Sequence, residues 1–475
     1  NFAGIGQIKF GKFHKLTAKA NYSDNELLDV SINPTHRVRC DLLPLYIAGS
    51  PRVNRACQMI LTALLLLTFV LLGAPLFSVI AASAMLGFYN SEIDLSIMAI
   101  EFFGLSEMPI LVAIPLFTFA GFVLSESNSP QRLVRLSNAL LGWLPGGLAI
   151  ISLASCALFT AFTGASGVTI IALGALLYPA LAEAGYDERF NLGLITTSGS
   201  LGLLFAPSLP LILYGIVASV PIDDLFLAGI LPGMFMLVLL AGYSYWKNRH
   251  AIVLTKVSGR EVVAAIRESM WELPLPVLVL GGIYSGYFAV SEAAAVTALY
   301  VIFVEIIVLR EIPWGELPRI MRESMVLVGA ILMILGVSLA STNYMIDASV
   351  PERLFEVVDT YVAGQASFLL ALLIFLLILG AILDIFSAII LVVPLIMPVA
   401  AQYDVHPVHL GIVFLATMEL GYLTPPVGLN LFISSFRFER SIAEIFRATF
   451  PFFMLLLVSV VIIAYWPSLS LVLLR

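Results

Sequence analysis

Apolar blocks long enough to cross a bilayer alternate with short polar breaks from residue 56 to the end of the chain. A transmembrane helix needs about 20 apolar residues. The pattern predicts ordinary spans at residues 108–124, 225–246, 273–290, 292–309, 324–339 and 450–466. Residues 56–91 predict a helix to residue 72, a break at 73–75 and a second short helix. Residues 1–55 contain no run of this length, and we interpret them as a polar leader whose native origin is open.

Four further apolar segments are too long or too interrupted to form one straight helix each. The interruptions lie at 145–147, 163–167, 206–207 and 424–426, and at Asp384. In chain order the segments predict a re-entrant hairpin at about 136–184, a broken helix at about 190–220, a second hairpin at about 366–403 and a second broken helix at about 408–435. The polar loop 247–272 separates an N-terminal half, 56–246, from a C-terminal half, 273–475.

The two halves repeat each other at one constant offset along the chain. The matching positions include Pro179 with Pro398, Gly202 with Gly421, and Pro207 with Pro426. Apolar matches are common in such a sequence, whereas glycine and proline matches at one offset are not. Paired interrupted segments in corresponding halves point to a transporter binding site near the bilayer midplane. The pattern therefore predicts an all-α polytopic membrane protein with two repeats, each holding a hairpin and a broken helix.

Composition and charge exclude several classes of protein. Hydrophobic residues make up 60% of the chain, charged residues 12%, and mean hydropathy is +1.02. These values exclude a soluble enzyme, a nucleic-acid-binding protein and a disordered chain. With the basic loop 247–272 placed in the cytoplasm, fourteen Lys and Arg after residue 55 fall inside and two, Arg353 and Arg475, fall outside. The repeats are then inverted and the N-terminus lies inside, whether or not the hairpins are re-entrant.

The predicted breaks supply chemistry that a straight helix lacks. Non-helical backbone at membrane depth is tolerated where it is buried in protein or lines a wet cavity. Its free carbonyls, together with Ser and Thr hydroxyls, suit Na⁺, and half-helix N-termini favour a carboxylate. The breaks lie at 163–167, 202–210, 380–387 and 421–428. A single kink is more often structural, but four in a symmetric pattern favour an ion and substrate site.

Six motifs in a fixed order resemble one known family. They are 114–121 (IPLFTFAG) with 144–147 (LPGG), 164–174, 201–215 (LGLLFAPSLPLILYG), 281–295, 380–394 and 421–430 (GYLTPPVGLN). Over residues 61–466 the sequence is similar to the DctM-type large membrane subunit of tripartite ATP-independent periplasmic (TRAP) transporters. The resemblance implies an elevator-type carrier of the bacterial inner membrane. It would import an organic acid, such as a C4-dicarboxylate or a sugar acid, with a Na⁺ gradient. It also implies two partners, a small four-helix membrane subunit and a periplasmic binding protein, and no cofactor or ATPase.

Candidate site residues follow from the breaks together with the resemblance. The expected Na⁺ ligands are Thr163, Gly164, Ser166, Gly202 and Pro207 at one site, and Asp384, Thr424, Pro425 and Gly428 at the other. The expected substrate path contains Ser208, Pro210, Pro426 and Asn430. No transition-metal site is expected. The sequence departs from the family's usual residues at Ala165, Ala206, Ile385 and Thr417, and Ala165 lacks a hydroxyl that the family often has.

Four carboxylates in apolar surroundings are candidates for special roles, because a charge inside the membrane is costly. Asp384 caps the helix that follows it, helps to hold Na⁺, or does both. Glu292 is predicted to start a helix or to belong to the scaffold, and Glu305 to snorkel or to pair at the surface near Arg310. Glu419 either faces the scaffold, pairs with a partner or binds a proton, and the residues leave these roles open.

Two other classes of protein stay open as alternatives. A standalone Na⁺/dicarboxylate symporter would share the hairpins but need no binding protein. An intramembrane serine protease would use Ser166, within GASG at 164–167, but no histidine is predicted inside a span to act as its base. His406 and His409 are expected in a loop rather than at a metal site. A channel is disfavoured because the hairpins would occlude a continuous pore.

Overall fold

The computed structural model describes residues 64–66, 68–69, 72–141, 146–249, 259–362 and 364–474. The chain divides into two compact units, residues 1–73 and 74–475, and the helices named below all belong to the second. The predicted leader, 1–55, lies outside the described residues, as does most of the helix predicted before residue 72.

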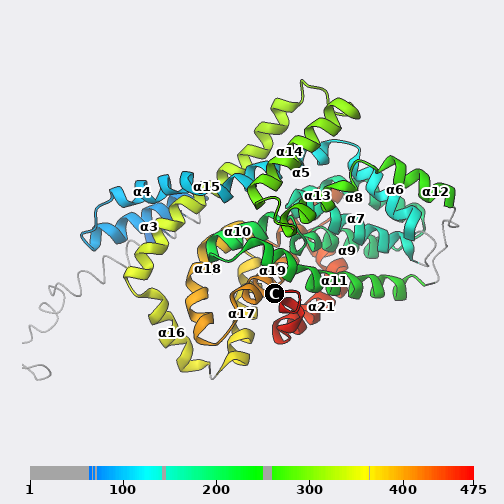
Figure 1. The fold of residues 1–475 in the computed structure, drawn as a ribbon. Coiled ribbons are helices and arrows are strands. Elements are labelled where there is room, and N and C mark those ends of the chain that lie inside the picture. The colour runs from blue at the N-terminus through cyan, green and yellow to red at the C-terminus, as the bar shows by residue number, and fades with distance from the viewer. Residues whose placement is uncertain are drawn as a thin grey trace, which may run out of the picture. The chain divides into compact units, whose positions relative to one another are not determined.

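All regular structure in the described residues is helical, as Figure 1 shows. The α-helices are α3 (Leu76–Asn90), α4 (Ser96–Gly104), α5 (Ala113–Glu126), α6 (Ser129–Leu141), α7 (Gly147–Thr163), α8 (Ser166–Glu183), α9 (Glu188–Ser198), α10 (Leu209–Ala218), α11 (Ile222–Lys247), α12 (Gly259–Glu268), α13 (Pro274–Tyr284), α14 (Val290–Ile302), α15 (Leu317–Asp347), α16 (Val350–Tyr361), α17 (Gln365–Gly380), α18 (Ile385–Gln402), α19 (Pro407–Gly421), α20 (Leu429–Phe438), α21 (Ile442–Tyr465) and α22 (Ser468–Leu471). The 3-10 helices η1 (Leu105–Glu107), η2 (Pro109–Val112) and η3 (Leu201–Leu204) and the π-helix η4 (Phe303–Val308) complete the set.

Local sequence explains where several helices begin and end. Asp187 accepts a hydrogen bond from the Phe190 backbone N–H at 3.2 Å, which starts α9. Ser441 and Glu444 exchange side-chain hydrogen bonds at the start of α21, forming a capping box. Gly164 follows α7 with φ of +65°, a left-handed conformation in which glycine ends helices at little cost. These are elementary signals of helix boundaries.

Seven helices among the described residues are long and apolar enough to cross a membrane, and up to nine spans result if each bent pair is one span. One such pair joins α9 and η3 to α10 at an angle of 43°, over the predicted break at 206–207. The prediction of an all-α, multi-pass membrane protein is therefore confirmed.

Two predicted spans differ from the structure. Residues 273–290 contain α13 and only the first residue of α14, and the 11 residues of α13 extend about 16 Å, well short of a hydrocarbon core of about 30 Å. The helix stops here because Gly286 adopts φ of +75° in the turn that follows. In the other direction, the span predicted at 324–339 is part of α15, which runs for 31 residues.

The helices of the two halves follow one another with the same spacing. α8 and α18 begin at Ser166 and Ile385, and α9 and α19 at Glu188 and Pro407, so both pairs keep the offset found in the sequence. Their packing is reciprocal: α8 packs on α20 and α18 on α10, while α9 packs on α21 and α19 on α11. Reciprocal contacts of this kind are those that a two-fold relation produces. The opposite orientation of the two halves in a bilayer stays a prediction.

The halves interlock through close contacts between α10 and α19. Tyr214 of α10 is fully buried, and its hydroxyl donates to the Pro407 carbonyl of α19 at 2.8 Å. The ring lies against Gly411, where a Cβ would come within 2.5 Å of it. Only glycine therefore lets α19 approach α10 so closely. These contacts hold α10 of the first half against α19 of the second half, which Figure 1 shows as neighbouring helices.

Candidate ion and substrate site

The tip between α7 and α8 is the first predicted ion site. α7 ends at Thr163, Gly164 and Ala165 form the turn, and α8 begins at Ser166. The Gly164 N–H donates to the Thr160 carbonyl at 2.7 Å, which closes the last turn of α7. The Thr163 hydroxyl is buried and has no hydrogen-bond partner among the described residues. A buried hydroxyl without a partner is costly, so its oxygen is available to a ligand.

The first helix break packs directly on this tip. The Thr160 hydroxyl donates to the Gly199 carbonyl at 2.9 Å. A Cβ at Gly202 would lie 2.2 Å from the Ala157 carbonyl oxygen, so glycine is required for this contact. At Gly164 a Cβ would lie 2.6 Å from the side chain of Leu209, the first residue of α10. The structure thus brings the α7–α8 tip and the first helix break together, and the sequence analysis assigned both to one predicted ion site.

The break itself is compact. The chain leaves η3 at Leu204, passes a cis peptide bond between Ala206 and Pro207, and enters α10 at Leu209. The Ser208 hydroxyl donates to the Leu203 carbonyl at 2.5 Å, so this candidate path residue is already engaged within its own turn. Pro210 lies in the first turn of α10, where proline is tolerated, and is buried.

The tip between α17 and α18 is the second predicted ion site. Asp384 accepts hydrogen bonds from the Ser387 backbone N–H at 3.0 Å and the Ser387 hydroxyl at 2.6 Å. It therefore caps α18, which confirms one of its two predicted roles. The next backbone N–H, that of Ile385, donates to the Tyr422 hydroxyl at 2.7 Å. This bond ties the tip to the second helix break.

The second break folds over the second tip. The backbone N–H groups of Val427 and Gly428 both donate to the Ala381 carbonyl, at 3.2 and 3.1 Å. Gly421 faces Gly380, and a Cβ on Gly421 would lie 2.6 Å from the Gly380 Cα. Gly202, the match of Gly421 in the first half, makes the equivalent close contact there, so both tips are held by the same device.

The two breaks differ in exposure. Pro207 and Ser208 are buried, whereas Pro425 and Pro426, which are joined by a cis peptide bond, are exposed. The Thr424 hydroxyl is half-buried and donates to the Leu420 carbonyl at 3.2 Å, leaving its oxygen free to accept or to coordinate. The second junction is therefore the more accessible one in this conformation.

Asn430 lies where the second half of the chain contacts the first. Its amide nitrogen donates to the Thr196 carbonyl of α9 at 3.2 Å, and the Thr196 hydroxyl donates to Ser434 at 2.9 Å. Its amide oxygen is buried without a hydrogen-bond partner among the described residues. No direct hydrogen bond links the two candidate path residues Asn430 and Ser208 in the described part of the chain.

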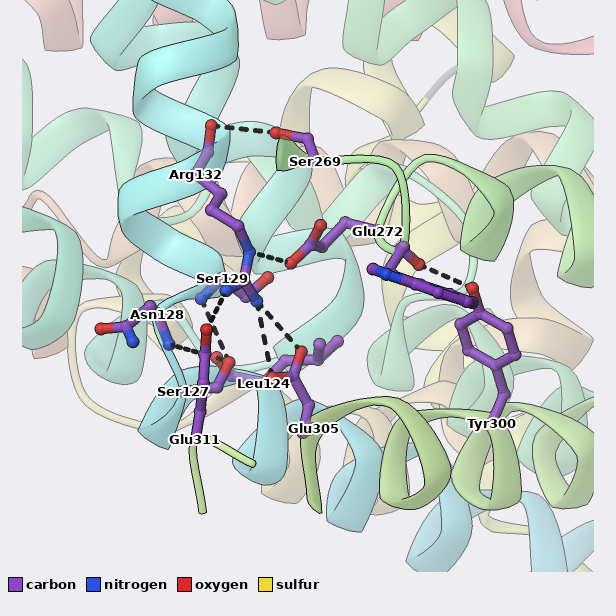
Figure 2. Close-up of polar contacts among 11 residues, drawn as sticks. Leu124, Ser127, Asn128, Ser129, Arg132, Ser269, Glu272, Tyr300, Glu305 and Glu311 are labelled. Carbon is purple, nitrogen blue, oxygen red and sulfur yellow. Dashed lines mark hydrogen bonds and ion pairs between the residues drawn. The ribbon is translucent and has the colours of Figure 1, made fainter. Parts of the chain in front are cut away.

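A buried polar cluster that the sequence analysis missed surrounds Arg132 of α6 (Figure 2). Its guanidinium group pairs with Glu272, with Glu311 and, at 3.3 Å, with Glu305. These carboxylates come from the turn before α13, the loop before α15 and η4. Arg132, Glu272 and Glu305 are at most 6% exposed and Glu311 is 16% exposed, so one buried cation faces three carboxylates, two of which are buried. We call these four residues the Arg132 cluster.

In the Arg132 cluster, burial and the neighbouring opposite charges shift pKa values in opposite directions. Burial raises the pKa of Glu272 above its ordinary value even though Arg132 lowers it. Burial would lower the pKa of Arg132, but Glu272 and the other carboxylates raise it. The backbone is tied in as well, because Asn128 N–H donates to Glu311 at 2.7 Å. The cluster fastens α6, which leads into the first hairpin, to three other segments.

Comparisons with known proteins agree with this architecture. The family described as "Tripartite ATP-independent periplasmic transporter, DctM component" matches residues 60–469. The "C4-dicarboxylate TRAP transporter large permease protein DctM" of Pseudomonas aeruginosa is 34% identical over 378 residues, 79% of this chain and 88% of that protein. The chain belongs to the DctM family of TRAP transporters. The resemblance found in the sequence motifs is thereby confirmed.

This TRAP permease is also similar to a second curated relative and to a solved transporter structure. The "Isethionate TRAP transporter permease protein DctMQ" of Oleidesulfovibrio alaskensis is 32% identical over 78% of this chain and 58% of that protein. The fold is similar to the solved YdaH transporter of Alcanivorax borkumensis, with a TM-score of 0.53 and 13% identity over 79% of this chain and 88% of that one. Its relatives are named as transporter permeases, so this DctM protein is a transporter and not a protease.

The structure of this DctM protein confirms one of the predictions for single polar residues and contradicts two others. Glu292 accepts from the Ala289 backbone N–H at 2.9 Å and starts α14, as predicted. The prediction for Glu305 is wrong, because it is 1% exposed and pairs with Arg132 across 173 residues rather than at the surface near Arg310. The prediction for His409 is also wrong. It is buried inside α19, where its ring contacts the Ala464 carbonyl at 3.1 Å.

Glu419 is the most isolated carboxylate in the described part of this permease. It lies in α19 and is 1% exposed, and neither carboxylate oxygen has a hydrogen-bond partner among the described residues. Pairing within that part of the chain is therefore excluded. The sequence pointed to Glu419 through its position in an apolar run, but nothing in the sequence could show that it lacks a partner.

Proposed function

We propose that this DctM protein is the large membrane subunit of a Na⁺-driven importer of organic acids in the bacterial inner membrane. Membership of the TRAP permease family supports transport as the activity. One observation carries the ion-coupling part of the proposal: each half holds a hairpin tip against a helix break, in the same way and at equivalent positions. Broken helices in paired repeats are where secondary transporters bind substrate and coupling ions.

The first Na⁺ site lies at the α7–α8 tip. The unpartnered Thr163 hydroxyl supplies one oxygen, and the non-helical backbone at Gly164, together with Ser166, supplies others. Gly202 and Pro207 belong to this site because the break packs on the tip. Such neutral oxygen ligands suit a hard, singly charged cation and leave transition metals without soft ligands.

The second Na⁺ site lies at the α17–α18 tip. Thr424, Pro425 and Gly428 supply hydroxyl and carbonyl oxygens from the break that covers it. Asp384 is held in place by its capping bonds and contributes negative charge to the site without being freed from α18. A carboxylate fixed in this way stabilises a cation by charge as well as by position.

The substrate is an organic anion that meets the N-terminal ends of α10 and α20. The unpaired N–H groups of a half-helix carry a partial positive charge that favours a carboxylate or a sulfonate. Ser208 and Pro210 lie at the start of α10, and Pro426 and Asn430 at the start of α20. Relatives named for C4-dicarboxylates and for isethionate suggest that the anionic group matters more than the rest of the substrate.

The transporter works with two partners. A periplasmic binding protein delivers the substrate, and a small four-helix membrane subunit completes the complex; the relative named DctMQ, of which this chain covers 58%, supports such a joint unit. Movement of both hairpins against the rest of the protein, in the manner of an elevator, then exposes the site to either side. A standalone symporter, which needs no binding protein, is the alternative.

Uptake into proteoliposomes tests the proposal. The chain and its small subunit are reconstituted, and labelled succinate or isethionate is offered with and without an inward Na⁺ gradient and with and without the cognate binding protein. Uptake that needs both is the expected result. Uptake that needs Na⁺ but no binding protein supports the standalone symporter, and uptake driven equally well by a K⁺ gradient contradicts Na⁺ coupling.

A further inference from the structure

A cavity rich in arginine lies between α9 and the junction of α20 with α21. It measures about 210 Å³ and is lined by Glu188, Arg189, Leu192, Arg440, Glu444 and Arg447. By the charge pattern of the sequence this end of the molecule faces the cytoplasm. None of its lining residues belongs to either hairpin tip, and the proposed transport mechanism makes no use of it.

The carboxylates of this cavity are already engaged, whereas two of its arginines are not. Glu188 pairs with Arg440 at 2.5 Å. Glu444 accepts from the Ser441 backbone N–H at 3.2 Å as part of the capping box of α21. Arg189 and Arg447 make no hydrogen bond or ion pair with any other residue that the structure describes. The cavity therefore carries a net charge of +1, since three arginines face two glutamates, and two free guanidinium groups.

Two helix N-termini add to this positive potential. α9, with 11 residues, begins at Glu188, and α21, with 24 residues, begins at Ile442, so the first turns of both helices border the cavity. Helix N-termini attract anions, and guanidinium groups bind phosphate in a bidentate manner. The combination is that of a site for a phosphate group.

The fold itself does not require arginine at these positions. At the matching positions of the repeat in the other half, where α19 meets α11, the residues are Val408, Pro221 and Ala228 in place of Arg189, Arg440 and Arg447. The reciprocal helix packing is the same in both halves, yet only this end carries the guanidinium groups. Their presence is therefore not explained by helix packing.

An apolar stripe runs from the cavity along the surface of α21. Phe450, Met454, Val458 and Val461 follow Arg447 at intervals of three or four residues, which places them on one face of the helix. All four are more than a third exposed in this chain. An acyl chain that starts at the cavity would lie along this stripe, whereas a free phosphate ion would leave it unused.

We propose that this cavity binds the headgroup phosphate of an anionic phospholipid of the inner leaflet, with an acyl chain along α21. Arg189 and Arg447 contact the phosphate oxygens, and Arg440, held by Glu188, closes one wall. Basic pockets between transmembrane helices on the cytoplasmic side bind such headgroups by the same chemistry. The bound lipid would fasten α9 and α21, which pack on each other, at their cytoplasmic ends.

Native mass spectrometry of the purified protein in detergent tests this site. Phosphatidylglycerol, phosphatidylcholine and inorganic phosphate are titrated separately onto the delipidated wild type, onto the double variant Arg189→Gln/Arg447→Gln and onto a control, Arg267→Gln/Arg322→Gln. The control removes two exposed arginines of α12 and α15. A thermal unfolding scan checks that each variant is folded, which is expected because all four substituted arginines are exposed.

We expect the wild type and the control to retain phosphatidylglycerol equally and the double variant to bind it about thirtyfold more weakly, since each of the two arginines near a membrane surface contributes on the order of 1 kcal/mol. Equal retention by all three proteins would overturn the site. Binding of inorganic phosphate at the same arginines, without any preference for phosphatidylglycerol over phosphatidylcholine, would overturn the lipid assignment in favour of a soluble phosphate.

Discussion

Replacing Arg132 by methionine tests whether the Arg132 cluster holds the first hairpin in place. Methionine fills a similar volume without the charge. The guanidinium group is 6% exposed and faces Glu272, Glu305 and Glu311, so its removal changes the local charge from −2 to −3. Removing one partner of a buried ion pair costs about 3–5 kcal/mol, because the remaining charges are left uncompensated. We expect Arg132→Met to be among the most destabilising single changes in the chain.

Two variants serve as matched controls for this prediction. Arg135→Met removes an arginine one turn further along α6 whose partners, Glu261 and Glu268, are exposed like itself, so it should change stability little. Glu305→Gln reduces the excess negative charge of the cluster to −1 and should cost less than Arg132→Met. Thermal unfolding in detergent provides the measurement. Equal midpoints for Arg132→Met and Arg135→Met would refute the reasoning.

Three further changes have defined outcomes. Gly202→Ala places a Cβ 2.2 Å from the Ala157 carbonyl oxygen and should lower the free energy of unfolding by about 1–3 kcal/mol. Gly242→Ala places its Cβ where no atom lies within 4 Å and should be neutral or slightly stabilising. Chemical denaturation of both variants provides the comparison. Asp384→Ala should cost about 1 kcal/mol through the lost cap, and Asp384→Asn should recover most of that in the same assay. Burial raises the pKa of the Glu272 carboxyl above its ordinary value of 4.5, so the folded state binds the carboxyl proton more tightly than the unfolded state does. The free energy of unfolding should therefore fall as the pH rises above 4.5. Thermal unfolding midpoints of Glu272→Gln, measured against pH, should lose that part of the pH dependence.

The sequence predicted the structure correctly at positions where one residue type determines the backbone conformation. Gly and Pro at 163–167, 206–207 and 424–426 interrupt helices for steric reasons that act locally, and the structure places breaks there. The constant offset between the halves was visible for the same reason, since matched glycines make matched helix contacts. The cap at Asp384 also follows from local chemistry.

The remaining features depend on residues that meet only in three dimensions. Arg132 and Glu305 are separated by 173 residues, so the sequence showed one as a cytoplasmic charge and the other as a surface carboxylate. The short α13 was missed because one glycine turn ended an apolar run that otherwise read as a full span. The burial of the Thr163 hydroxyl without a partner is a property of packing, which no motif displays.

The Na⁺ dependence of uptake in three proteins tests the central claim most directly. Initial rates of uptake are measured against Na⁺ concentration for the wild type, Thr163→Val and Thr424→Val, with binding protein and substrate in excess. Valine keeps the shape of threonine and removes the hydroxyl oxygen. The account predicts that each variant needs markedly more Na⁺ for half-maximal uptake while remaining folded. An unchanged Na⁺ dependence in both variants would contradict the placement of the coupling ions at the two hairpin tips.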